Sequence, residues 1–265
     1  MAYRDAGKVM TAGDDGEEEN SFGPSREVRR PGPSYQTMET AATDHAAQIE
    51  ARSRLGAIIH AETHEQEIKQ YSQWVNTYDQ DMVILGFNGY NACSRKVAEV
   101  APNKTVKILD LGCGTGHFGE MLGLMGYENI CGIDANQSFV EKSRAREIYR
   151  QVEIVDIGSN SGIPFDDESF DIIIGISVIG PRAMDQHTLP EVNRILRKGG
   201  YFIAFMRKSR LEMQTEDFDV KSVFEKYEVD GTWERQADLG VPFYQNAVDG
   251  DVVEIDGVVV TIRKR

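Results

Sequence analysis

The stretch ILDLGCGTGHF, residues 108–118, decides the fold of this 265-residue chain. It begins with apolar residues typical of a buried strand and continues into glycines at positions 112, 114 and 116. Glycine allows a sharp turn and lets a ligand approach main-chain N–H groups where a helix begins. In an open α/β sheet such a junction lies in the crevice beyond the carboxyl ends of the strands, where ligands bind. The stretch therefore predicts a nucleotide-like ligand at the end of this strand.

The sequence after Pro102 alternates short apolar runs with helical stretches. Three consecutive isoleucines, Ile172 to Ile174, suit a strand buried on both faces, which is typical of a parallel sheet covered by helices. We expect strands at 106–111, 130–134, 152–155, 170–177 and 201–206, and helices near 118–125, 138–148 and 188–196. This order predicts a doubly wound, mostly parallel α/β sheet built from right-handed βαβ units.

Three regions are expected along the chain. Residues 1–42 are acidic and poor in apolar surface, which predicts a disordered tail. Residues 43–102 carry apolar residues at helical spacing, and we expect an N-terminal lid or cap with either one long helix or two helices separated by residues 60–64. Residues 103–265 should form the core, which ends in antiparallel strands joined by a two-residue turn at Asp256-Gly257.

Two nucleotide ligands compete for the glycine loop, because residues 114–119 also satisfy the dinucleotide pattern G-x-G-x-x-G. Asp110 lies two residues before the first glycine, where a carboxylate would repel a pyrophosphate but suit a ligand with a cationic ammonium and sulfonium. Asp134 ends the second strand, where either ligand would place a ribose diol. Asp156 and Ile157 end the third strand as a carboxylate and an apolar group, a pair suited to an adenine ring. These acids favour S-adenosylmethionine over NAD.

The sequence resembles class I methyltransferases in five motifs: ILDLGCGTG, GID followed by Ala135, VDI, SFDIII and LRKGGYF. The short flanks Tyr78-Asp79-Gln80 and Thr232-Trp233-Glu234 are similar to those of the Williams-Beuren-region methyltransferase-like group. The resemblance implies a seven-stranded Rossmann-like sheet and S-adenosyl-L-methionine as the cofactor. It also implies a donor site formed by Asp110, Gly112, Cys113, Gly114, Gly116, Asp134, Ala135, Asp156, Ile157 and Ser177.

The sequence does not identify a catalytic residue. The Asn/Asp-Pro-Pro-aromatic motif typical of amino methylation on nucleobases is replaced by Ser177-Val-Ile-Gly180-Pro181, which favours a small-molecule or protein acceptor. His187 is a weak candidate for a base, and Tyr78 and Tyr90 suit either a lid over the donor or simple packing. Two other functions remain open: a donor-binding scaffold without turnover, and an NAD-dependent oxidoreductase.

Composition indicates which partners and which cellular compartment to expect. The formal net charge of -14 disfavours nucleic acid as a partner. The three cysteines form neither a metal-ligand spacing nor a disulfide framework, so we expect no metal and a reducing compartment. A secretory signal and a membrane-spanning run are both missing from the sequence pattern, which predicts a cytoplasmic protein. The oligomeric state is not encoded in any pattern that we recognise.

Overall fold

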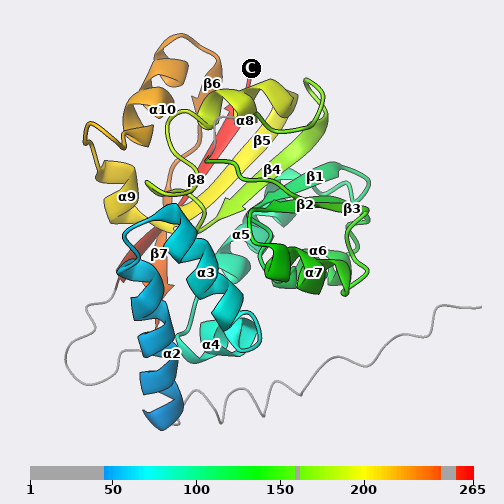
Figure 1. Cartoon of the computed structure of the whole chain (residues 1–265). Helices are drawn as coiled ribbons and strands as arrows, with labels where there is room; N and C mark the ends of the chain where they lie inside the picture. Colours follow the sequence, from blue (N-terminus) through cyan, green and yellow to red (C-terminus); the bar gives the residue numbers. More distant parts are fainter. Residues whose placement is uncertain (1–44, 159–161, 246–254) are drawn as a thin grey trace, which may run out of the picture. The chain divides into compact units, whose positions relative to one another are not determined.

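A single sheet with helices on both faces organises the residues that the computed structural model describes, 45–158, 162–245 and 255–265 (Figure 1). Five parallel strands lie in the order β3-β2-β1-β4-β5, and β8 then pairs antiparallel with β5. The strands are β1 (Lys107–Leu111), β2 (Asn129–Asp134), β3 (Gln151–Ile154), β4 (Phe170–Ile176), β5 (Leu196–Arg207), β6 (Trp233–Arg235), β7 (Leu239–Tyr244) and β8 (Ile255–Lys264). The predicted doubly wound, mostly parallel sheet with antiparallel C-terminal strands is confirmed.

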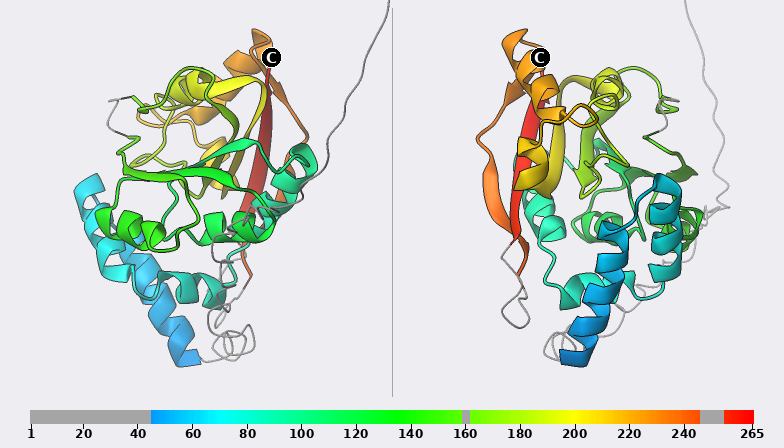
Figure 2. Two further views of the ribbon diagram at one scale, coloured as in Figure 1. Left: turned by 90° about the vertical axis from the view of Figure 1, so that its right-hand side faces the viewer. Right: turned by 60° about the vertical axis from the view of Figure 1, so that its left-hand side comes forward.

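The sheet has eight strands where seven were expected, because its edge strand is interrupted. Both β6 and β7 pair antiparallel with β8, β6 beside residues 262–264 and β7 beside residues 255–259. Since β5 occupies the other side of β8, these two short strands share one edge. Figure 2 shows this arrangement, with red β8 between yellow β5 and the orange edge strands.

The turn predicted at Asp256-Gly257 is wrong, because both residues lie inside β8. There Gly257 pairs with Val241 on one side and with Arg207 on the other. A Cβ atom on Gly257 would lie 2.8 Å from the Val241 carbonyl oxygen and 2.9 Å from the Phe205 ring. This glycine therefore permits close strand packing, and the connection from β7 to β8 runs through residues 245–254, most of which lie outside the described residues.

Of the two arrangements expected before the core, one long helix or two, the structure has two helices. Two helices are separated by residues 60–63, and the Thr63 hydroxyl caps the second by accepting the Gln66 N–H. The described helices are α2 (His45–Ile59), α3 (His64–Trp74), α4 (Tyr78–Ile84), α5 (Gly89–Val100), α6 (His117–Leu124), α7 (Gln137–Arg144), α8 (Leu189–Ile195), α9 (Lys208–Glu212) and α10 (Val220–Val229). The helix expected to reach residue 148 ends at Arg144, since the chain turns at Glu147 with φ 57°.

Two apolar cores form on opposite faces of the sheet, because successive strand residues point to opposite sides. On β1, Ile108 packs with residues of α2, α5 and α6, whereas Leu109 packs with residues of α8, α9 and α10. The same alternation holds for Ile172 and Ile173 on β4. Fully buried, isoleucine-rich strands of this kind explain why the core residues could be recognised in the sequence.

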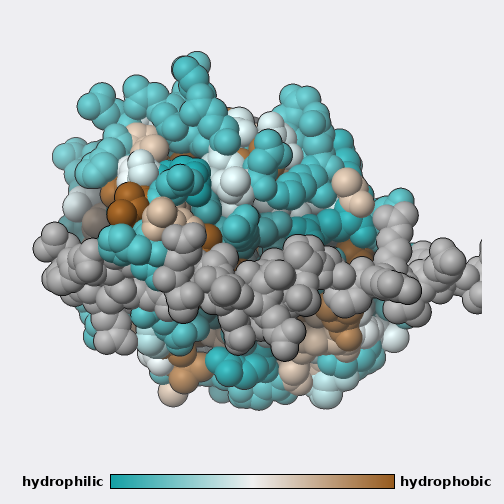
Figure 3. Space-filling view, turned by 90° about the horizontal axis from the view of Figure 1, so that it is seen from below, coloured by the Kyte–Doolittle hydropathy of each residue, from teal (hydrophilic) through white to brown (hydrophobic). Residues whose placement is uncertain are grey.

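The predicted tail, residues 1–42, lies outside the described residues. The boundaries between the three expected regions, at 42/43 and 102/103, stay predictions. Among the described residues, no helix has the length and apolar character needed to cross a membrane. Hydrophilic residues dominate the face seen in Figure 3, and the hydrophobic areas on it are small and separate.

Candidate active site

The glycine loop between β1 and α6 is fixed by the neighbouring strand end. The Asp134 carboxylate accepts the Gly114 N–H at 2.9 Å with one oxygen and the Asn136 N–H at 2.8 Å with the other. Gly112, Gly114 and Gly116 have φ values of 68°, 55° and 80°, a conformation that favours glycine. The loop therefore needs its glycines, and Asp134 holds the loop at the carboxyl end of the sheet.

Asp134 also faces a cavity of about 790 Å³. Burial raises the pKa of its carboxyl group, while the two backbone hydrogen bonds act in the opposite direction. Each carboxylate oxygen has two lone pairs and uses one for the backbone, so one acceptor position on each oxygen stays available. This chemistry fits a pair of vicinal hydroxyl groups.

Asp110 lies beneath the loop and is 2 % exposed. The Tyr149 hydroxyl donates a hydrogen bond of 2.7 Å to its carboxylate. Burial raises the pKa of Asp110 to about 7, with a further contribution from the negative charge of Asp134, and the Tyr149 hydrogen bond only partly offsets this. The Tyr149 ring packs against Gly119 and Gly132, where a Cβ atom would overlap it. Gly119, the last glycine of the dinucleotide-like pattern, therefore makes room for a tyrosine.

The cavity brings together most of the residues predicted for the donor site. Seven line it: Gly112, Gly114, Asp134, Ala135, Asp156, Ile157 and Ser177. Three do not: Asp110, Cys113 and Gly116. Cys113 is buried 3.8 Å from the Ser143 hydroxyl, and a Cβ atom on Gly116 would lie 2.7 Å from the same oxygen. Cys113 and Gly116 therefore take part in the packing between the loop and α7.

A second cavity, of about 850 Å³, adjoins the first at the end of β4. Ser177, Val178, Tyr71 and Tyr78 line both, so the two cavities form one continuous site. Ser177 has a left-handed backbone with φ 60°, and its N–H donates to the Phe205 carbonyl at 2.7 Å. This conformation turns the chain away from the sheet where the cavities meet.

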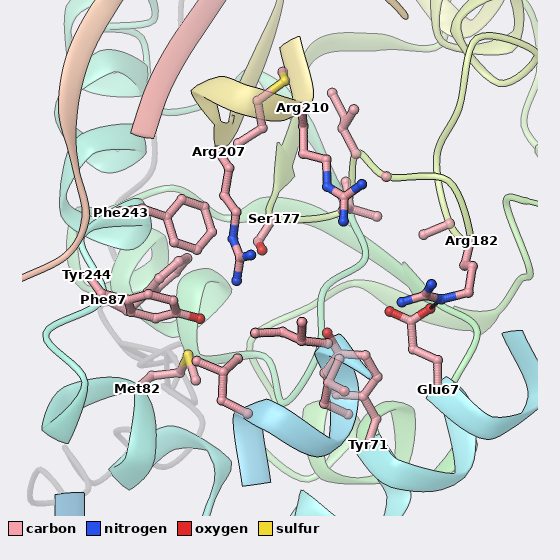
Figure 4. A pocket seen from close by; sticks show the side chains of 18 of the residues that line it. Glu67, Tyr71, Met82, Phe87, Ser177, Arg182, Arg207, Arg210, Phe243 and Tyr244 are labelled. Carbon is pink, nitrogen blue, oxygen red and sulfur yellow. Dashed lines mark hydrogen bonds and ion pairs between the residues drawn. The ribbon is translucent and has the colours of Figure 1, made fainter. Parts of the chain in front are cut away.

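Three arginines line the second cavity (Figure 4). Arg182 is paired with Glu67, with 3.0 Å between Nε and Oε2. Arg207 and Arg210 point into the cavity from β5 and α9, and neither forms an ion pair with a carboxylate of the described ranges. The Nη1 of Arg210 donates to the Met213 sulfur at 3.7 Å.

The N-terminal helices cover both cavities and are attached to the glycine loop and α7. The Asn136 amide donates to the Ile68 carbonyl at 2.8 Å, and Lys142 donates to the Val75 carbonyl at 2.8 Å. Tyr71 and Tyr78 both pack on Phe139, with ring centroids 5.6 and 5.1 Å apart.

Asp79 connects the start of α4 to the loop directly. Its carboxylate accepts the Thr115 hydroxyl, and Arg146 Nη2 lies 2.5 Å from its Oδ2. Arg146 Nε also donates to the Thr115 carbonyl at 2.7 Å. In the Tyr78-Asp79 flank noted in the sequence, Tyr78 therefore lines the cavities and Asp79 binds the glycine loop.

Several site residues were missed by sequence reasoning, and two suggested ones lie elsewhere. His64 lines the donor cavity, with its Nε2 3.2 Å from the Asp156 carboxylate. Tyr90 packs on His117, with ring centroids 5.1 Å apart, and lines neither cavity. His187 is exposed and outside both linings. The helical spacing before the core predicted a cover, but not which side chains face inward.

The walls of the second cavity lack an evident base. Glu67 is the one carboxylate among its described lining residues, and Arg182 neutralises it. Burial raises the pKa of Tyr71 and of Tyr78 well above the usual value for tyrosine, so both hydroxyls stay protonated near neutral pH. An acceptor bound here must therefore present its own unprotonated nucleophile or lose a proton to water.

Comparison with known proteins agrees with this geometry. Residues 109–204, which run from β1 to β5, match the family described as "Methyltransferase domain". The chain contains a methyltransferase domain. The match includes the glycine loop, Asp134, Asp156 and Ser177, and the sheet around it has the Rossmann-like methyltransferase fold.

Relatives extend the likeness beyond the domain. The chain is 22% identical to human methyltransferase-like protein 27 over 70% of this chain and 75% of that protein. It is 34% identical to the 18S rRNA (guanine(1575)-N(7))-methyltransferase of Saccharomyces cerevisiae, over 37% of this chain and 38% of that protein. Among solved structures, a putative methyltransferase in complex with the Haloferax volcanii Trm112 activator has a TM-score of 0.56. It is 17% identical, and the match covers 73% of this chain and 97% of that one.

Proposed function

We propose that the chain transfers a methyl group from S-adenosyl-L-methionine to a small-molecule acceptor. The observation that carries the proposal is the junction of two cavities at Ser177, one lined by the glycine loop and the other by arginines and aromatic rings. The first fits the donor and the second fits an acceptor. A cover formed by α2, α3 and α4 favours a small acceptor over an intact protein surface.

The residues of the donor cavity fit the parts of S-adenosyl-L-methionine. The free acceptor positions on Asp134 suit the ribose hydroxyls, and Asp156 with Ile157 suits the adenine amino group and ring. The backbone of Gly112 and Gly114 lines the opposite part of the cavity, where it suits the methionyl group. Asp110 contributes indirectly, by holding Tyr149 and the loop, because it does not line the cavity.

When bound, the donor supplies a methyl group already activated by its sulfonium. The acceptor's lone pair forms the new bond to carbon, the S–CH₃ bond breaks, and its electron pair stays on sulfur. The protein's contribution is to align the two molecules and exclude water, with Tyr71 and Tyr78 closing the site above the junction. A protein base is not required.

Calorimetric titration with S-adenosylmethionine, S-adenosylhomocysteine and NADH tests the proposal. We expect both adenosyl ligands to bind and NADH not to bind. Binding of NADH alone would favour the oxidoreductase. Adenosyl binding without transfer of labelled methyl to any small molecule of a metabolite extract would favour the scaffold.

Asp134→Ala tests the donor site itself. We expect at least a tenfold loss of affinity for S-adenosylhomocysteine, because charge-assisted hydrogen bonds contribute roughly 1.5–3 kcal/mol each. The matched control is Asp166→Ala, which removes an exposed carboxylate away from both cavities. Equal affinity in the two folded variants would refute the role of Asp134.

A further inference from the structure

The acceptor cavity combines an apolar wall with two arginines that form no ion pair among the described residues. Arg207 is the last residue of β5 and Arg210 lies in α9, so both guanidinium groups enter from the same side. Phe87, Phe243 and Tyr244 form an aromatic wall of the same cavity (Figure 4). A cavity with a cationic side and an apolar side predicts a ligand that has an anionic group and an apolar body.

We propose that the acceptor is a small organic acid with an apolar or aromatic body, whose carboxylate is bound by Arg207 and Arg210. This inference rests on the proposed function, because it identifies the substrate class of the same site. Arginine presents a planar fork of N–H donors that matches the two oxygens of a carboxylate.

Within the described ranges, neither of these two arginines forms an ion pair with a carboxylate. Arg182, the third arginine of the cavity, has Glu67 as its partner at 3.0 Å. Arg207 instead lies over the Phe243 ring, with 5.4 Å between its guanidinium carbon and the ring centroid, and beside the Tyr244 hydroxyl. Both arginines are half-buried, and a half-buried cation attracts an anion more strongly than a solvated surface arginine does.

Electrostatic repulsion among the three arginines of the cavity also favours an anionic ligand. Burial and the positive charges of Arg207 and Arg182 lower the pKa of Arg210 from its usual value, while Glu67 acts in the opposite direction. A bound carboxylate would relieve this repulsion and replace lost hydration. Two converging like charges repel each other, and an anion bound between them turns this cost into attraction.

The apolar wall restricts the rest of the ligand. The Phe87 ring lies 5.2 Å from Phe243 and 5.7 Å from Tyr244 between centroids, and Met82 adds a flexible apolar side chain. Such a surface packs against rings or short aliphatic chains. This wall offers few hydrogen-bond partners, so the part of the ligand that lies against it should be apolar.

The experiment uses the full chain saturated with S-adenosylhomocysteine. Benzoate, phenylacetate and hexanoate are titrated calorimetrically, each against its uncharged amide. We expect at least one acid to bind and its amide to bind at least tenfold more weakly. Arg207→Gln and Arg210→Gln should each weaken that acid at least tenfold and leave affinity for S-adenosylhomocysteine unchanged. Arg95→Gln, an exposed arginine of α5, is the matched control and should change neither affinity.

The outcomes separate the inference from the proposed function. If the wild type fails to bind S-adenosylhomocysteine, the proposed function itself fails. If that ligand binds but no acid does, or acids and amides bind equally, the inference alone is overturned. Should a glutamine variant not fold, Arg207→Lys and Arg210→Lys replace it. Unchanged acid affinity in the folded arginine variants would also overturn the inference.

Discussion

Asp110 ends its strand beneath the glycine loop, where the Tyr149 hydroxyl is its hydrogen-bond donor. Asp134 ends the next strand and has two backbone N–H donors as well as access to the cavity. At residue scale the difference is burial: one carboxylate is held among protein groups, and the other has oxygens available to a ligand. The pKa of Asp110, near 7, makes this difference measurable.

We expect Asp110→Asn to stabilise the fold more at pH 8 than at pH 5. The folded protein holds a proton on Asp110 up to about pH 7, whereas the unfolded chain releases it near the usual pKa of 3.8. The contribution of Asp110 to stability is therefore complete below pH 3.8 and is lost as the pH rises to about 7. Asparagine has no such loss, so the gain should grow by about 2 kcal/mol between the two pH values.

Urea unfolding at both pH values measures this difference in free energy of unfolding. Asp166→Asn, an exposed aspartate, is the control and should show no growth with pH. A pH-independent effect of Asp110→Asn would mean that Asp110 is ionised throughout this range in the folded protein.

At residue scale the sequence could predict groups that end strands, because strand ends of a parallel sheet meet at one edge. Asp134, Asp156, Ile157 and Ser177 were found in this way, and all line the donor cavity. Of the residues contributed by other elements, Tyr78 was suggested as part of a lid, and it lines both cavities. The others could not be found. Tyr149 reaches Asp110 only because the chain turns after α7, and no local pattern encodes that contact.

At the scale of elements, a buried carboxylate joins the covering helices. Asp81 in α4 is 1 % exposed and accepts from Trp74 Nε1 at 2.5 Å, from Arg54 Nε at 2.6 Å and from the Thr77 hydroxyl at 3.1 Å. These donors come from α3, from α2 and from the turn between α3 and α4. The cover therefore depends on one polar centre, which no pattern in the sequence identified.

We expect Asp81→Ala to loosen the cover without unfolding the sheet. Removing the carboxylate leaves a buried indole N–H and a guanidinium without their acceptor, at a cost of roughly 1–3 kcal/mol per group. Hydrogen exchange should become faster in α2, α3 and α4 and stay unchanged in β1, β4 and β5. Glu99→Ala, which removes an exposed carboxylate paired with Lys96 on α5, is the control. A uniform increase across the sheet strands would contradict this assignment.

The edge of the sheet gives a second prediction at this scale. Gly257→Ala places a methyl group against the Val241 carbonyl and the Phe205 ring, and we expect a loss of about 1–3 kcal/mol in stability. Gly240 on the adjacent β7 is the matched control, because a Cβ atom there has open space within 4 Å. Thermal unfolding of the two alanine variants compares them. Equal melting temperatures would show that β8 shifts freely to accommodate the side chain.

The five central strands and their helices could be predicted because each strand carries apolar residues that are buried in the sheet. The edge could not. Asp-Gly is a strong turn signal when only neighbours in sequence are considered, yet Gly257 is required by a strand and a ring that are distant in sequence. The same limitation hid the interruption between β6 and β7.

At the scale of the whole molecule, net charge bears on the class of acceptor. The yeast relative is named as an rRNA methyltransferase, and its match covers 38% of that protein. The formal net charge of the present chain is -14. Long-range repulsion from a nucleic acid backbone acts on the entire molecule, so a similar domain does not imply a similar partner.

We expect the full chain not to bind RNA at physiological ionic strength. The measurement is fluorescence anisotropy of a labelled RNA hairpin and of a labelled single strand, from 50 to about 200 mM salt, with S-adenosylhomocysteine titration on the same preparation as the control for a folded protein. A protein that binds through phosphates loses affinity steeply as salt rises, because counterions are released from the nucleic acid. Micromolar binding with that salt dependence would mean that local basic surface outweighs the total charge. The small-acid acceptor would then have to be tested against RNA as the methylated substrate.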